Sequence, residues 1–191
     1  MSFRALVGLS LGLMLAACVT TGPVNTLTQE KRDSLRIASV DVGFAQDATI
    51  EWQDAQGGAP EDAAARLAFL KQKAIMPIKA ALDAEMLRVF RGSDPATLRV
   101  RIRTVKIPAT ATTIIIANIP YTIKADVELI DARSGKTLLA ASDFDGLSAT
   151  FGGVIGIVHA AVAEEPIIRA SKAFAHVLEI WLKTGVKQAM G

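Results

Sequence analysis

Two segments near the middle of the chain alternate apolar and charged residues with a period of two. Between Thr97 and Lys106 the apolar residues alternate with arginines, and between Tyr121 and Leu129 they alternate with Lys124 and two carboxylates. This period is typical of a strand with one face on a core and the other in solvent. The pattern predicts two strands, which as antiparallel neighbours would set the row Arg99, Arg101 and Arg103 opposite Asp126 and Glu128.

The arginine row permits two interpretations. It forms either a solvated, ion-paired face or a site for an anion or a lipid headgroup. The carboxylates on the next strand favour the ion-paired face, since opposite charges across a sheet stabilise its register.

The remaining elements are predicted from spacing and turn residues. We expect a strand over 35–42, a helix over 60–91, a strand over 136–144 after a hairpin at 131–135, and a helix over 164–187. Pro77 should kink the first helix or split it near Met76, because proline lacks an N–H group. The order β-α-β-β-β-α predicts an α+β fold: a two-layer sandwich with a mainly antiparallel sheet and helices on one face.

The start of the chain reads as a targeting segment. A short basic start precedes an apolar stretch from Ala5 to Ala16, which ends at the only cysteine, Cys18. The stretch would reach about 18 Å as a helix, too short for a bilayer core of about 30 Å. We therefore assign 1–17 to a signal peptide, 18–34 to a flexible tether that begins at Cys18, and 35–191 to a single α+β domain.

The sequence Leu15-Ala16-Ala17-Cys18 resembles the lipobox of bacterial lipoproteins. This resemblance implies that diacylglycerol is attached to the Cys18 thiol and that cleavage makes Cys18 the first residue. Val19 stands where some families carry an aspartate for inner-membrane retention, which implies an outer-membrane anchor facing the periplasm. The hairpin over 130–139 resembles those of small periplasmic and outer-membrane lipoproteins and of envelope-transport auxiliary lipoproteins.

Charge and cysteine content exclude several classes of protein. The chain has 21 lysines and arginines against 19 aspartates and glutamates, so no nucleic-acid partner is expected. With Cys18 acylated, no thiol remains for a disulfide.

Two long segments, 107–123 and 146–163, carry no charge over nearly their whole length. Loops are normally polar, so these segments either fold back over the core or form an exposed apolar patch at one end of the sheet. In the second case the surface would bind the protein itself, as a homo-oligomer, or an envelope partner. The candidate interface residues are Ile114, Ile115, Ile116, Phe151, Val154, Ile155 and Ile157.

Catalytic and metal-binding chemistry has little support in the sequence. His159 and His176 lack the spacing of a metal or hydrolase motif, and Asp143 with Asp145 more often closes a turn than forms a catalytic pair. We expect no catalytic residues, metal or cofactor, and no enzyme activity. The sequence favours a lipid-anchored binding or assembly module. The alternative is a periplasmic carrier of an acyl chain or a transport-auxiliary lipoprotein.

Overall fold

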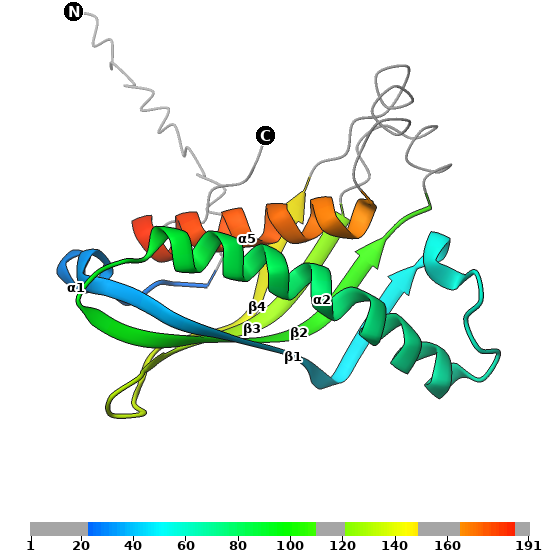
Figure 1. Ribbon diagram of the computed structural model, residues 1–191, viewed down its shortest axis with the longest axis horizontal. Helices are drawn as coiled ribbons and strands as arrows, with labels where there is room; N and C mark the ends of the chain where they lie inside the picture. Colours follow the sequence, from blue (N-terminus) through cyan, green and yellow to red (C-terminus); the bar gives the residue numbers. More distant parts are fainter. Residues whose placement is uncertain (1–22, 110–120, 149–164, 186–191) are drawn as a thin grey trace, which may run out of the picture.

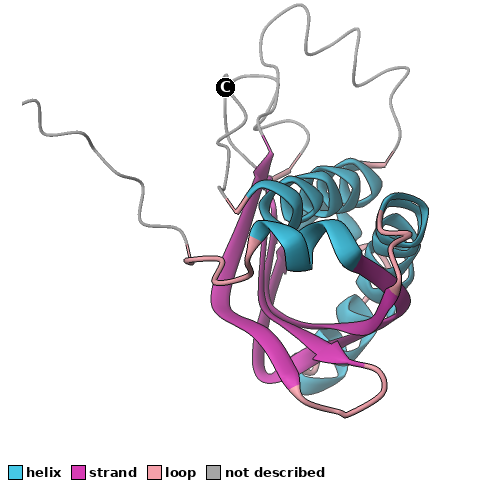
Figure 2. Cartoon of the chain, turned by 90° about the vertical axis from the view of Figure 1, so that its left-hand side faces the viewer, coloured by secondary structure: helices cyan, strands magenta, loops and turns pink. Residues whose placement is uncertain are grey.

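The computed structural model describes residues 23–109, 121–148 and 165–185. Within them a four-stranded sheet is covered on one face by two long helices, α2 and α5 (Figure 1; Figure 2). The elements are α1 (Gln29–Ser34), β1 (Leu35–Trp52), η1 (Gln53–Gln56), α2 (Ala63–Val89), β2 (Asp94–Ile107), β3 (Tyr121–Asp131), β4 (Thr137–Ser148) and α5 (Pro166–Thr184).

The sheet has the order β1-β2-β3-β4. β1 and β2 are parallel and are joined through α2, whereas β2–β3 and β3–β4 are antiparallel. The α+β fold and the predicted order of strands and long helices are confirmed. The register places Glu128 opposite Arg99 and Asp126 opposite Arg101, as the alternating charges predicted.

β1 is much longer than the predicted strand over 35–42. It continues to Trp52 and pairs with β2 along both segments, with register shifts after Ile37 and after Phe44. Each shift interrupts the period of two, so the second half of the strand does not continue the pattern of the first. The prediction ended at the point where the alternation changes.

The sequence predicted that Pro77 would kink or split the first helix, and α2 is not split there. It runs unbroken from Ala63 to Val89, and Asp62 caps its start by accepting a hydrogen bond from the Ala65 amide at 2.8 Å. Ala74 and Ile78, on either side of the proline, are fully buried. Their packing offsets the one backbone hydrogen bond that proline cannot make.

The core lies between the sheet and the two long helices. Phe144 of β4 packs against Phe174 and Trp181 of α5, with ring centroids 6.0 and 5.1 Å apart. Gly146 allows this close approach, because a Cβ there would lie 2.4 Å from the Phe174 ring. The amphipathic C-terminal helix is confirmed, and it ends at Gly185 in the left-handed conformation, with φ 77°.

Residues 23–34 of the segment predicted as a tether, 18–34, lie in the described part of the chain. From Pro23 onward it belongs to the folded body: Leu27 is buried, and α1 begins after Thr28, whose side chain accepts a hydrogen bond from the Lys31 amide. The Trp181 indole donates to the Pro23 carbonyl at 3.0 Å. Pro23 and Asn25 thus contact a helix more than 150 residues away, in a stretch for which the sequence predicted a tether.

Candidate functional site

Several residues singled out from the sequence fall outside the described parts of the chain. These are the lipidation residue Cys18, His159 and all seven candidate interface residues in the two uncharged segments. The structure therefore leaves the predicted apolar interface as a prediction. The described residues contribute three other features: an ion-paired sheet face, a cluster around His176, and an apolar groove between the long helices.

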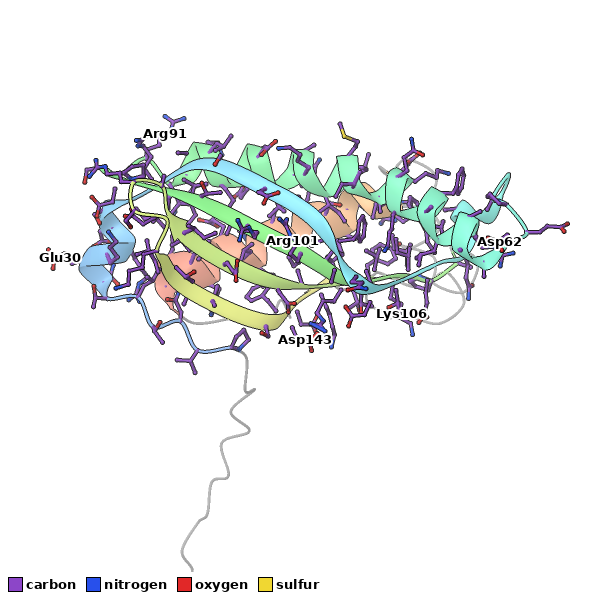
Figure 3. The ribbon with its side chains drawn as sticks, turned by 90° about the horizontal axis from the view of Figure 1, so that it is seen from below. Glu30, Asp62, Arg91, Arg101, Lys106 and Asp143 are labelled. Atoms are coloured by element: carbon purple, nitrogen blue, oxygen red, sulfur yellow. The ribbon has the colours of Figure 1, made fainter. Side chains whose placement is uncertain are left out.

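The open face of the sheet carries the arginine row, and each of its arginines has a carboxylate partner. Arg99 lies 3.2 Å from Glu128, and Arg103 lies 3.0 Å from Asp126. Arg101, labelled in Figure 3, lies 2.6 Å from Asp41 on β1. The ion-paired interpretation is confirmed for this face. The partners on β1 were not foreseen, because the sequence gives no signal of the parallel β1–β2 pairing.

Ion pairing also lowers the pKa of a carboxyl group on this face. The hydrogen bond from Arg101 holds the pKa of Asp41 below its ordinary value of 3.8, and Arg99 contributes in the same direction. Near α1, a hydrogen bond from Lys31 lowers the pKa of Asp94. Both carboxylates thus favour the charged form in the folded protein.

Acid is expected to destabilise the domain below about pH 4. Asp41 has a lower pKa folded than unfolded, so its contribution to stability is complete above 3.8 and is lost as the pH falls through the folded pKa. Thermal unfolding followed by circular dichroism across this range measures the effect. Asp41→Asn should flatten the decline, whereas Glu30→Gln, at an exposed carboxylate on α1, should leave it unchanged. Identical profiles for the wild type and Asp41→Asn would contradict this assignment.

The aspartate pair Asp143 and Asp145 lies at an irregularity in β4. The register shifts between Phe144 and Ala141, and Asp143 adopts a positive φ of 52°. Its amide donates to Asp126 at 3.0 Å, and Lys124 lies 3.5 Å from Asp143 and 3.9 Å from Asp145. The pair thus contributes to a β-bulge and to the ion pairs of the open face.

His176 lies between two carboxylates at the crossing of α2 and α5. Its Nδ1 is 3.5 Å from Glu179 of the same helix and 3.9 Å from Glu85 of α2, and the three ligand atoms lie within 4.8 Å of one another. Each carboxylate also has a basic partner: Lys183 at 2.9 Å from Glu179 and Arg88 at 3.2 Å from Glu85. The basic partners reduce the negative charge available to a cation, and His176 and Glu85 form a polar contact between the two helices.

An apolar groove of about 680 Å³ runs between α2 and α5 on the side away from the sheet. Its floor is formed mainly by small side chains, and Met76, 67% exposed, stands at its edge. Glu85, Lys172 and His176 supply its polar rim. The apolar lining is Met76, Pro77, Ala80, Ala81, Ala84, Ile168 and Ala175. Sequence analysis missed this groove, because alanines spaced along a helix resemble the edge of a core stripe.

No family model matches this sequence, and no curated protein matches it. Three solved structures show some likeness. A candidate lipoprotein from Caulobacter crescentus is 13% identical, with a TM-score of 0.37, and the match covers 82% of this chain and 92% of the other. A PelC dodecamer from Paraburkholderia phytofirmans is 13% identical, with a TM-score of 0.33 and coverage of 77% and 86%. A lipoprotein from Neisseria meningitidis is 21% identical, with a TM-score of 0.17 and coverage of 65% and 93%.

These likenesses are too low to assign a fold family. The class of the protein is defined by its own geometry: an α+β domain with an ion-paired open sheet face and an apolar groove on its helical layer. Among the described residues, no helix has both the length and the apolar character needed to cross a membrane.

Proposed function

We propose that this protein is a lipoprotein of the bacterial envelope, anchored through Cys18, whose domain binds an apolar segment of a partner in the α2–α5 groove. The lipobox-like sequence Leu15-Ala16-Ala17-Cys18 supports the anchor and the periplasm-facing location. The single observation that supports the binding role is the apolar groove between α2 and α5. We propose further that the domain is not an enzyme.

The groove has the properties of a surface that receives a helix. Ala80 and Ala84 are one turn apart on α2 and both are exposed, so a partner backbone can approach closely. Met76 is flexible and polarisable, and methionine adapts to irregular apolar surfaces. Glu85 and His176 at the rim offer polar contacts to the ends of a bound segment.

Crosslinking from the groove tests the binding role. A photoreactive residue at Ala80 should capture a defined envelope protein, which is then identified, purified and shown to bind the isolated lipoprotein. Ala84→Glu places a charge on the apolar floor and should weaken that binding about tenfold or more, or about 1.4 kcal/mol. Ala68→Glu makes the same change on an exposed part of α2 outside the groove and should bind like the wild type. Equal loss of binding in both variants would refute the groove as the binding surface.

A second function, carriage of an acyl chain, is favoured by the size of the groove. Its volume of about 680 Å³ lies within the range of about 300–1,000 Å³ typical of small-molecule sites, and its lining is apolar. Native mass spectrometry distinguishes the two functions. A carrier should retain a lipid that Ala84→Glu releases and Ala68→Glu does not, whereas a binding module should retain none.

A further inference from the structure

We propose that the end of the domain formed by α1, the β3–β4 hairpin and the last turn of α5 docks onto anionic phospholipid headgroups. This inference rests on the proposed anchor at Cys18. It adds an orientation: one particular end of the domain faces the bilayer, and the opposite end faces the periplasm.

The first observation that supports this orientation is the small number of residues between Cys18 and Pro23. The chain is fastened at Pro23 by the Trp181 indole, and the Asn25 side chain donates to the Trp181 carbonyl at 2.8 Å. Between Cys18 and Pro23 there are five residue steps, which span at most about 18 Å. The lipidated residue therefore cannot lie farther than this from the C-terminal turns of α5. The folded body is held at the headgroup level instead of hanging from a long tether.

The second observation is the set of arginines at the end of the domain where α1 lies. Arg36 and Arg91 are exposed and have no ion-pair partner among the described residues, in contrast to the fully paired arginine row of the sheet. Arg32 donates only to neutral oxygens, those of Leu27 and Gln29. The guanidinium groups of Arg36 and Arg91 are thus available to phosphate oxygens, whereas the Nε of Arg32 is buried and its other two nitrogens already donate within the protein.

Residues of α1, β2 and the β3–β4 hairpin bring further charges to this end. Asp94 pairs with Lys31 at 2.5 Å, and Asp131 accepts hydrogen bonds from the Ser134 and Arg133 amides inside the hairpin. Apart from the Arg88–Glu85 and Lys183–Glu179 pairs, the described residues here comprise six basic groups and four carboxylates. The basic groups are Lys31, Arg32, Arg36, Arg91, Arg133 and Lys136, and the carboxylates are Glu30, Asp33, Asp94 and Asp131.

The opposite end carries charges of both signs: Lys106 lies 3.2 Å from Glu51, and Lys73 lies over the Trp52 ring. Asp54, Glu61 and Asp62 gather there with Arg66, around the start of α2. Figure 3 shows Asp62 at the far end of the molecule from Glu30 and Arg91. A negatively charged bilayer attracts the end that carries Arg36 and Arg91, so these charges and the short distance along the chain from Cys18 to Pro23 favour the same orientation.

Fluorescence quenching in vesicles tests this orientation with the lipidated protein purified from cells. One fluorophore is placed on Ser93→Cys, beside Arg91, and another on Glu61→Cys at the far end; both positions are exposed. The vesicles contain nitroxide-headgroup lipid in phosphatidylcholine, with or without phosphatidylglycerol. In the anionic vesicles, quenching at position 93 should be several times that at position 61. Salt should reduce the difference, because it screens exposed charges.

Charge-reversal variants identify the groups responsible. Arg36→Glu with Arg91→Glu should bring the two quenching values close together, whereas Lys73→Glu, an exposed position on α2 away from this end, should preserve the difference. Equal quenching at both positions in wild-type protein that floats with the vesicles would overturn the proposed orientation. Failure to float even with neutral vesicles would instead overturn the lipid anchor, so the two proposals fail in distinguishable ways.

Discussion

Gly92→Ala is expected to lower the free energy of unfolding by about 3 kcal/mol or more, the largest effect of any glycine substitution in the described chain. A Cβ at this position would lie 2.1 Å from the Ser34 carbonyl oxygen and 2.8 Å from that of Leu35. Both contacts are with backbone, so no side-chain rotation can relieve them. The Gly92 amide also donates to the Leu35 carbonyl at 2.9 Å, and this bond joins the turn after α2 to the start of β1.

Chemical denaturation of the purified protein measures this effect. Gly57→Ala is the matched control, because its φ is −57° and no atom lies within 4 Å of a Cβ built there. That control should change the free energy of unfolding by less than about 0.5 kcal/mol. A Gly92→Ala variant as stable as Gly57→Ala would show that the α1–β1 junction moves apart at little cost.

Cys18→Ser is expected to abolish acylation completely, which is the largest expected effect on where the protein resides. A serine hydroxyl is not a thiolate, so the lipid-transfer step implied by the lipobox resemblance has no nucleophile at this position. Each buried CH₂ of an acyl chain contributes about 0.8 kcal/mol to membrane binding, so two or more chains hold the protein effectively permanently. Labelling with an alkyne fatty acid, followed by mass spectrometry of the N-terminal peptide, measures the modification.

A second variant tests whether acylation requires the lipobox-like motif or only a cysteine near this position. Cys18→Ser combined with Thr21→Cys retains one cysteine but moves it away from Leu15-Ala16-Ala17. It should remain unlabelled, as the single variant does. Fatty-acid labelling of either variant would contradict the assignment of Cys18 as the anchor.

The sequence predicts the sheet best where one face is buried and the other is charged. In β2 and β3 a period of two identifies both strands, their pairing with each other, and the ion pairs that join them. In β1 the same reasoning fails after Val42, because the register shift between Phe44 and Thr49 changes which residues face the core. An alternating sequence pattern predicts a strand only where the strand pairs with its neighbour in a regular register.

Long-range contacts explain the other differences. The stretch at 23–34 is mostly polar and begins at a Gly-Pro pair, residues 22–23, so its composition is that of a linker. It is held by Trp181 and by the burial of Leu27, neither of which has a local signature. The α2–α5 groove is likewise missed, because it exists only once two helices far apart in sequence pack together.

The docking of residues near Pro23 onto Trp181 has a practical consequence for handling this protein. The amide of Gly185 and the side chain of Asn25 both donate to the Trp181 carbonyl, so α5 ends where the anchor segment joins the body. A tag fused after α5 would therefore begin next to the end of the domain that leads to the proposed anchor at Cys18. An epitope inserted at Gly57–Gly58, where added atoms meet no neighbour within 4 Å, would project from the far end of the domain and stay accessible to antibodies.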